Sequence, residues 1–242
     1  MEFYDSEFYA DMEISSLTSA KEIIPILISR YHPKSVVDVG CGTGAFSREF
    51  LQNGIEDVIG YEGEWMWKTP TLLPKDKYFY FDFTNEITPK KPYDLCLCLE
   101  VAEHLDYSVA RTLISSLTAL SQRVVFSAAI PHQGGNHHVN EQWPEFWAQL
   151  FAEKGYILSW DPRLSIWNNS RIAPCYRQNL LVFEKSTEQE RVIPPSLVHP
   201  EAWILAMKYR KPPIWLKVSR LIPRPLLRSG KRLFKRILGG AQ

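Results

Sequence analysis

The chain has 242 residues, of which 45% are hydrophobic and 13% aromatic, and it carries 28 Lys and Arg against 27 Asp and Glu. This composition excludes disordered, collagen-like and small disulfide-stapled proteins, and the length is sufficient for one large core. The four cysteines are too few and too scattered for a stapled secreted fold, so we expect a reducing, cytoplasmic compartment. No apolar run approaches the ~20 residues of a membrane span, and the acidic N-terminus has the wrong charge for a signal peptide.

Charge divides the chain into two parts. Residues 201–242 contain eleven Lys and Arg and one acidic residue, Glu201, whereas residues 1–200 contain 17 basic and 26 acidic residues. Seven of the 17 prolines lie between residues 191 and 225, where they interrupt regular structure. We therefore expect a folded domain at 1–188, whose residues 1–33 form a helical lid or cap, and a Pro-rich linker with a basic amphipathic C-terminal extension at 189–242.

Within the domain, short β-branched or aromatic runs alternate with helical patterns. Strands are predicted at residues 35–39, 57–62, 78–83, 94–99, 123–128, 156–160 and 179–184. Helices are predicted at residues 18–30, 45–52, 107–122 and 144–153. The alternation is typical of βαβ units and predicts an α/β fold with a largely parallel sheet. Only an irregular stretch separates the last two strands, which indicates an antiparallel pair at the end of the sheet.

A glycine-rich turn follows the first strand directly. Gly40, Gly42 and Gly44 lack side chains, which allows the backbone to approach a ligand closely. Glu62 ends the second strand, where a carboxylate can accept both hydroxyls of a ribose. Asp38 would repel a pyrophosphate but suits a cationic ligand that carries an amino-acid group. The turn therefore favours such a ligand over a dinucleotide.

These residues resemble the motifs of the class I S-adenosylmethionine-dependent methyltransferases. The resemblance covers about residues 34–185 and includes the loop at 38–44, the strand ends at 58–62 and 81–84, and the segment 93–105. It implies S-adenosylmethionine as the cofactor. It also implies a Rossmann-like, seven-stranded, mostly parallel sheet with helices on both faces and an antiparallel last strand, to which the basic C-terminal extension is added.

The resemblance further implies which residues contact the cofactor. The glycine loop would pack on the methionine and ribose, and Glu62 would hold the ribose hydroxyls. The strand end after residue 81 would meet the adenine, although an Asp at that position is often only a turn cap. The end of the fourth strand would form the floor of the site. The predicted cofactor-binding residues are Asp38, Gly40, Cys41, Gly42, Gly44, Glu62, Asp82, Phe83, Leu99 and Glu100.

Methyl transfer to a hydroxyl requires in-line positioning of the nucleophile and removal of its proton. His104 follows the fourth strand, and the polar loop at 130–143, which contains three histidines, follows the fifth. Ligands of open α/β sheets bind at this edge. We expect His138 to be the general base, with His104 and Glu103 as further catalytic residues; a polar surface loop without a catalytic role is the alternative.

A metal site is a second interpretation of the same residues. Glu100, Glu103 and His104 share one face if the chain is helical there, and His138 would add a second imidazole to two carboxylates. Small-RNA 2′-O-methyltransferases have a similar Glu-x-x-Glu-His and a distant His that bind a metal. Because the same motif also occurs in methyltransferases that need no metal, the sequence leaves the metal ligands unassigned and favours a metal-free site.

The sequence therefore predicts methyl transfer from S-adenosylmethionine to an oxygen of a small-molecule or glycan acceptor. The alternatives are an RNA methyltransferase in which a metal activates the 2′-hydroxyl, and a regulatory protein that binds the cofactor without catalysis. The acidic domain argues against nucleic acid, because it repels a phosphate backbone.

The C-terminal extension predicts a contact of its own. Basic and apolar residues alternate through 208–238, which is typical of a segment lying on an anionic membrane surface. Such binding would place the protein peripherally at the inner face of a membrane and favour a lipid-linked acceptor. Packing of the extension on the acidic domain is the alternative.

Overall fold

The computed structural model describes residues 6–187 and 192–209, with side chains described from residue 13 to residue 207 outside the gap at 188–191. Residues up to Ala206 belong to one compact unit, and a second unit begins at Met207. The predicted boundary at residue 188 stays a prediction, because it falls beside the gap. Of the predicted linker and extension at 189–242, the structure describes residues 192–209, and residues 210–242 lie outside the described residues.

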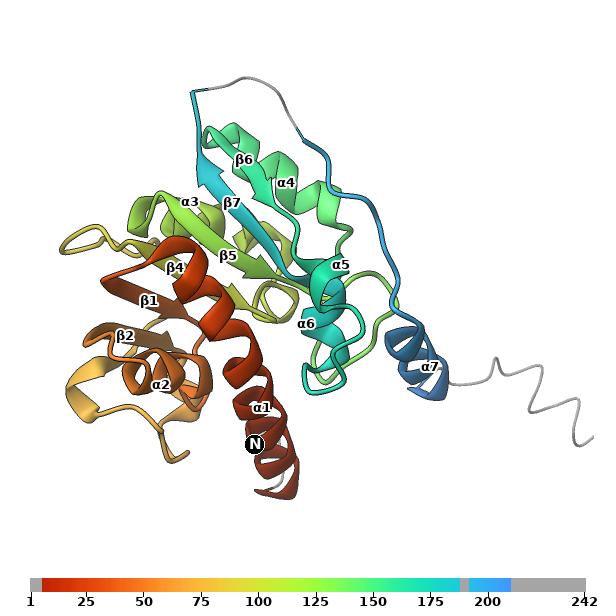
Figure 1. Cartoon of the computed structure of the whole chain (residues 1–242), viewed down its shortest axis with the longest axis horizontal. Helices are drawn as coiled ribbons and strands as arrows, with labels where there is room; N and C mark the ends of the chain where they lie inside the picture. The colour runs from red at the N-terminus through yellow and green to blue at the C-terminus, as the bar shows by residue number, and fades with distance from the viewer. Residues whose placement is uncertain (1–5, 188–191, 210–242) are drawn as a thin grey trace, which may run out of the picture. The chain divides into compact units, whose positions relative to one another are not determined.

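The described residues contain a seven-stranded sheet with the order β3-β2-β1-β4-β5-β7-β6 (Figure 1). The strands from β3 to β5 are parallel, whereas β7 is antiparallel to both β5 and β6. The predicted fold class is therefore confirmed. The antiparallel strand β7 lies between β5 and the edge strand β6. The strands are β1 (Ser35–Val39), β2 (Asp57–Glu62), β3 (Tyr78–Tyr80), β4 (Leu95–Leu99), β5 (Arg123–Ser127), β6 (Tyr156–Trp160) and β7 (Leu181–Lys185).

Helices cover both faces of this sheet (Figure 1). Side chains alternate along each strand, so Leu95, Leu97 and Leu99 of β4 join one core, and Cys96 and Cys98 join the other. The helices are α1 (Ser6–Tyr31), α2 (Ala45–Gln52), α3 (Ala110–Leu120), α4 (Pro144–Glu153), α5 (Arg163–Ile166), α6 (Pro174–Asn179) and α7 (Pro200–Tyr209). Residues of α1, α2 and α6 pack in the first core and residues of α3 and α4 in the second.

Local turn chemistry explains where the observed elements differ from the predicted ones. The third strand ends at Tyr80 because Asp82 accepts hydrogen bonds from the Thr84 N–H (3.0 Å) and hydroxyl (2.8 Å), which fixes a turn. Asp106 caps a short 3-10 turn, so α3 begins only at Ala110. The last strand begins at Leu181, because Asn179 ends helix α6.

Three short 3-10 turns also lie on the path between strands, in addition to the one before α3. Two of them, Glu64–Met66 and Lys75–Lys77, connect β2 to β3. The third, Ala102–His104, follows β4 and carries two of the predicted catalytic side chains to the carboxyl edge of the sheet. None of the described helices combines the length and the apolarity needed to cross a bilayer.

Candidate active site

The glycine loop between β1 and α2 is closely packed on one side and open on the other. Gly40, Gly42 and Gly44 have φ values of 75°, 57° and 90°, in the left-handed region that favours glycine. A Cβ at Gly40 would overlap Val101, and one at Gly44 would overlap Leu73. A Cβ at Gly42 would meet no atom within 4 Å. The loop therefore has room for a ligand directly above Gly42.

Glu62 connects the end of β2 to this loop. One carboxylate oxygen accepts the Gly42 N–H at 2.6 Å, and the other accepts the Gly63 N–H at 2.8 Å. Burial raises the pKa of Glu62, and the two backbone donors oppose that rise. Each oxygen still has a second lone pair. Glu62 can therefore hold the loop and at the same time accept hydrogen bonds from the hydroxyl groups of a ligand.

Asp38 lies beneath the loop, with only 3% of its surface exposed. Its carboxylate accepts a hydrogen bond from the Ser47 hydroxyl at 2.7 Å. Burial raises the pKa of Asp38 to about 7, and the nearby Glu62 carboxylate adds to the rise. A cationic group bound beside Asp38 would favour its ionised form.

The other predicted cofactor residues lie along the same edge with different degrees of exposure. Phe83 is buried in the core beside Phe81, and Leu99 is buried on the opposite face of the sheet. Asp82 is exposed, and its carboxylate caps the turn described above. The Cys41 sulfur packs over Gly60, so the thiol fills space behind the loop. These positions are compatible with a cofactor, and the individual contacts stay predictions.

Side-chain amides of α6 and of the polar loop hold the Glu100 carboxylate. Glu100 has a left-handed φ of 54°, and its carboxylate accepts hydrogen bonds from the Asn179 amide at 3.1 and 3.3 Å and from the Gln133 amide at 3.3 Å. The Gln178 side-chain amide donates to the side-chain amide oxygen of Gln133 at 2.8 Å and extends this network. Burial raises the pKa of Glu100. These amides tie β4, the polar loop and α6 together.

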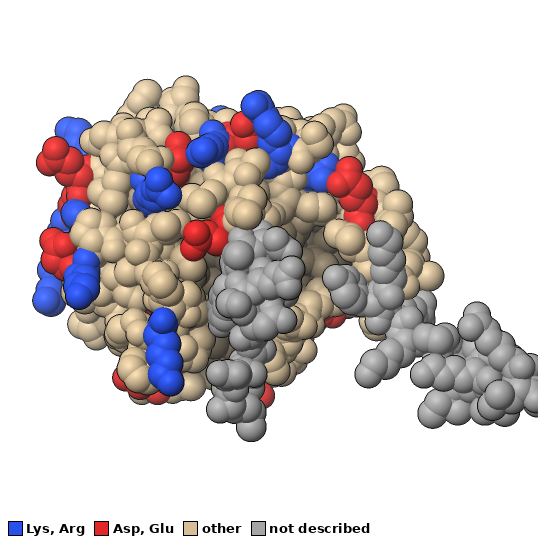
Figure 2. Space-filling model, turned by 90° about the horizontal axis from the view of Figure 1, so that it is seen from below, with Lys and Arg blue, Asp and Glu red and all other residues tan. Residues whose placement is uncertain are grey.

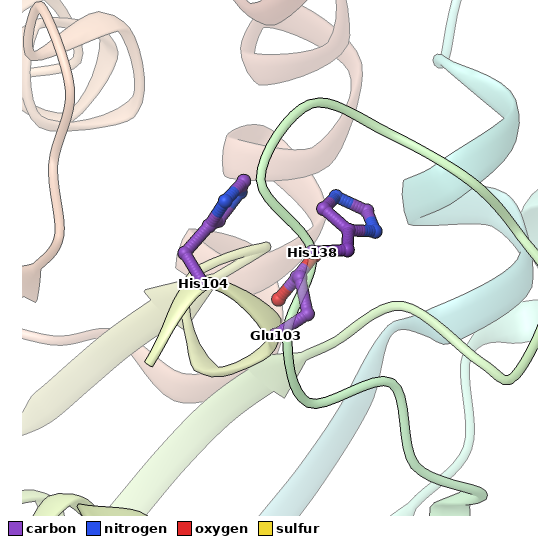
Figure 3. A group of neighbouring side chains, drawn as sticks. All are labelled: Glu103, His104 and His138. Carbon is purple, nitrogen blue, oxygen red and sulfur yellow. The ribbon is translucent and has the colours of Figure 1, made fainter. Parts of the chain in front are cut away.

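The structure brings Glu103, His104 and His138 together (Figure 3). The two imidazole rings meet edge to face with centroids 4.8 Å apart, and one ligand atom from each of the three residues lies within 4.8 Å of the others. The Glu103 carboxyl is fully buried beneath the rings, and neither of its oxygens has a hydrogen-bonding partner among the described residues. Burial, with the neighbouring Glu100, therefore holds the pKa of Glu103 well above its usual range.

The environment of His104 keeps its ring neutral. The residue is exposed on one side, but the loop packs against the ring and withdraws it from water. This desolvation, with the neighbouring His138, lowers the pKa of His104 to about 4. The loop itself is fixed to the turn before it, because the Val139 and Asn140 N–H groups both donate to the Glu103 backbone oxygen.

Glu141 is a functional candidate that the sequence analysis missed. One of its carboxylate oxygens lies 3.0 Å from His138 Nδ1 and accepts the Gly134 N–H, and the other accepts the His132 N–H at 2.7 Å. Because a carboxylate only accepts, this contact places a proton on Nδ1 of His138. A His and a Glu three residues apart are a weak signal in a loop, and only the folded turn shows that they meet.

The donor set of Glu103, His104 and His138 also fits a divalent cation. Imidazole nitrogens and a carboxylate oxygen suit borderline ions, and the unpartnered Glu103 oxygens would gain a partner. Glu100, the fourth ligand weighed from the sequence, does not join the group, because amides of α6 and the polar loop hold its carboxylate.

Comparison with known proteins agrees with this architecture. A family model described as a methyltransferase domain matches residues 20–166, more than half of the chain. Similar solved structures include the methyltransferase domain of bacterial CtHen1-C (TM-score 0.51, 18% identity, covering 70% of this chain and 98% of that chain) and DesVI of Streptomyces venezuelae (TM-score 0.55, 14% identity, 74% and 95%). A candidate O-methyltransferase of Nostoc punctiforme PCC 73102 has a TM-score of 0.53 at 15% identity (74% and 59%). The comparison with curated proteins finds no match.

The fold and the glycine loop place the protein among the class I S-adenosylmethionine-dependent methyltransferases. The chain belongs to the methyltransferase-domain family. The predictions of class, enzymatic nature and cofactor are confirmed at this level. The loop fits the cofactor, because it combines open space above Gly42 with carboxylates at the ends of two neighbouring strands.

Proposed function

We propose that the protein transfers a methyl group from S-adenosylmethionine to an oxygen atom of a small-molecule or glycan acceptor. The observation that carries this proposal is the hydrogen bond between His138 Nδ1 and the Glu141 carboxylate. It leaves Nε2 of His138 with the lone pair that a general base needs. One solved neighbour is itself named as a candidate O-methyltransferase.

The residues of this chain supply positioning and proton transfer. The cofactor, when bound, supplies an activated methyl group on a sulfonium. His138 takes the proton of the acceptor hydroxyl as the O–CH3 bond forms and the bond between the methyl carbon and the sulfonium sulfur breaks, and Glu141 stabilises the resulting imidazolium. His104 stays neutral because its pKa is about 4, so it does not repel the charge that develops on His138. The proton then leaves to solvent.

The composition of the polar loop supports the proposed acceptor class. The loop is rich in amide and carboxylate side chains, among them Gln133, Glu141 and Gln142, which suit a polyhydroxyl compound. Residues 1–200 carry an excess of acidic over basic residues, which repels a polyphosphate. A glycan or a neutral small molecule therefore fits better than RNA.

A replacement of His138 tests the role of the base. We expect His138→Ala to lower S-adenosylhomocysteine release with hydroxyl acceptors by about 100-fold or more, since general-base catalysis contributes about 10²–10⁴-fold. Calorimetry should find unchanged affinity for S-adenosylhomocysteine. His32→Asn is the matched control, because His32 precedes β1 at the opposite edge of the sheet. Undiminished turnover in His138→Ala would exclude the proposed base, and no turnover in the unmodified enzyme with a broad acceptor panel would favour the non-catalytic alternative.

A metal-assisted reaction is the second candidate, and the convergence of Glu103, His104 and His138 favours it. In that reaction a divalent cation would lower the pKa of the acceptor hydroxyl, and RNA would rejoin the candidate acceptors. Chelation with EDTA separates the two candidates. The proposed metal-free reaction keeps its rate after chelation, whereas a metal-assisted one loses it and recovers it with added Mn²⁺ or Mg²⁺.

A further inference from the structure

Helix α7 presents apolar side chains to solvent. Trp203, Ile204 and Leu205 are 54%, 54% and 40% exposed, and Ala202 is the buried contact of this helix with the protein. Single exposed apolar residues are ordinary on protein surfaces, but three consecutive ones span about 200° around a helix, so most of the circumference of α7 at this turn is exposed and apolar; we call these three side chains the α7 patch. Exposed apolar side chains of this kind are typical of a surface that binds a partner.

The sequence that continues from α7 is cationic. Residues 208–242 contain eleven Lys and Arg and no Asp or Glu, and apolar residues lie between them. Residues 210–242 lie outside the described part of the chain, so only the charge and hydropathy of their sequence are considered. Apolar side chains followed by many cations suit an anionic lipid surface, where the former enter the headgroup region and the latter meet phosphates.

The single acidic residue in this part of the chain is already paired. Glu201 lies 2.5 Å from the Arg177 guanidinium of α6, so it does not offset the cations of the tail. On the face of the molecule seen in Figure 2, basic and acidic side chains are mixed without a continuous patch of either sign. In the sequence, the cationic excess begins at Lys208, because residues 1–200 carry 17 basic against 26 acidic residues.

The segment before α7 is fastened to the catalytic side of the protein. We call residues 192–201, which include the first two residues of α7, the strap. The His199 backbone N–H donates to the side-chain amide oxygen of Gln178 at 2.9 Å, and the His199 ring contacts the Trp167 backbone oxygen at 2.9 Å. Gln178 also donates to Gln133 of the polar loop. A surface bound by α7 therefore connects through α6 to the loop that carries His138.

We propose that α7, together with the cationic sequence after it, docks the protein on an anionic membrane surface. This docking does not depend on the proposed acceptor. It fits the acceptor chemistry, since an acceptor glycan carried by a lipid would be held at the same surface as the enzyme. Each cation near an anionic leaflet strengthens binding about fivefold, so even part of the tail gives measurable partition.

Vesicle flotation of the full-length protein tests the proposal. We expect flotation with vesicles containing about one-third phosphatidylserine, weak flotation with pure phosphatidylcholine, and release when salt rises to about 0.5 M. The double variant Trp203→Glu, Ile204→Glu should bind about tenfold less or weaker, because its apolar patch is lost. A fourfold neutralised tail (Lys231→Gln, Arg232→Gln, Lys235→Gln, Arg236→Gln) should also bind less, and its residual binding should depend less on salt.

Ile14→Glu is the matched control, because Ile14 is an apolar residue on helix α1 with 63% of its surface exposed. Its flotation should equal that of the unmodified protein. Circular dichroism melts of every variant establish that the fold is intact. The proposal is overturned if the unmodified protein does not float with anionic vesicles, which is the result expected when the tail packs on the acidic domain. Equal flotation with neutral vesicles, or equal losses in Ile14→Glu and the α7 variant, would overturn it as well.

Discussion

The carboxylate of Glu141 organises the polar loop from within. It accepts hydrogen bonds from the backbone of His132 and Gly134 and faces Nδ1 of His138, so three donors converge on one side chain. A side chain at Gly135 would come within 2.2 Å of the His138 ring, which shows how closely the loop fits around it. The position and the tautomer of His138 both depend on this arrangement.

Glu141→Gln should therefore reduce turnover without unfolding the protein. The Gln amide brings a donor where all three partners are donors, and if it faces His138 the ring adopts the other tautomer, with no lone pair on Nε2. We expect kcat to fall by about 10- to 1,000-fold, since a misassigned tautomer is severe in related base–carboxylate pairs. Affinity for S-adenosylhomocysteine should stay constant. Glu145→Gln in the first turn of α4 is the control, and equal kcat values for the two variants would rule out the positioning role.

The raised pKa of Asp38 predicts that cofactor binding depends on pH. Its pKa is about 7 in the free protein, so below this pH the carboxyl is mostly protonated. If the ammonium group of the cofactor pairs with the ionised form, binding must first release that proton. Affinity should then rise by up to about tenfold per pH unit below pH 7 and level off above it. Calorimetry between about pH 5.5 and 8.5 measures this slope, and Asp38→Asn should abolish it. A flat profile in the unmodified protein would contradict the pairing.

At the scale of elements, the side-chain amides of Asn179 and Gln133 hold the Glu100 carboxylate and join α6 to the polar loop. We call these two amides the clamp. Asn179 is buried at the end of α6 and donates to the Glu100 carboxylate and to Gln133. A buried carboxylate that loses a donor costs about 1–3 kcal/mol. The acceptor side of the site, which the polar loop lines, should respond to this loss more than the cofactor side does.

Asn179→Leu tests the clamp, because leucine has nearly the same size and no donor. We expect a severalfold higher KM for the acceptor and faster hydrogen exchange in the polar loop, with nearly constant affinity for S-adenosylhomocysteine. Asn169→Leu is the control, since Asn169 also donates to a carboxylate, that of Glu22 on α1, away from the loop. If both variants behave alike in acceptor KM and loop exchange, the clamp does not position the loop.

Elements with a strong local pattern were predictable from the sequence. The alternation of strands and helices and the loop from Asp38 to Gly44 depend on short-range signals, so they were found near their observed positions. The turn after β4 and the loop after β5 were expected at one edge of the sheet and lie there, because parallel strands carry their carboxyl ends at the same edge. The grouping of His104 with His138 follows from that topology.

Contacts between distant polar residues were not predictable in the same way. Asn179 was expected to begin a strand, but it ends α6 and reaches Glu100, which is 79 positions away in the chain. No periodicity in the sequence encodes such a pair. The positions of the polar loop and α6 relative to each other are set only when the whole sheet has formed. The direction of the Glu100 side chain was unpredictable for the same reason. Its absence from the group of candidate metal ligands could therefore not be predicted either.

At the scale of the whole molecule, the strap joins the last described segment of the chain to α6. Arg177 is 2% exposed; it donates to the Trp167 carbonyl and the Glu201 carboxylate and contacts the His199 ring. The strap and α7 contribute few buried residues of their own, among them His199 and Ala202. Their attachment therefore depends on this one guanidinium more than on apolar burial.

Arg177→Met should release the strap while the domain stays folded. Methionine keeps most of the volume of the side chain but none of its donors, so the ion pair with Glu201 and the hydrogen bond to Trp167 are lost. We expect hydrogen exchange of the His199 amide to rise about tenfold or more, because it is protected by the neighbouring Gln178, and the melting temperature to fall by only about 2–8 °C. Arg171→Met is the control, since Arg171 makes an exposed ion pair with Glu22 and should leave the strap protected. Unchanged exchange at His199 in Arg177→Met would show that contacts other than this guanidinium hold the strap.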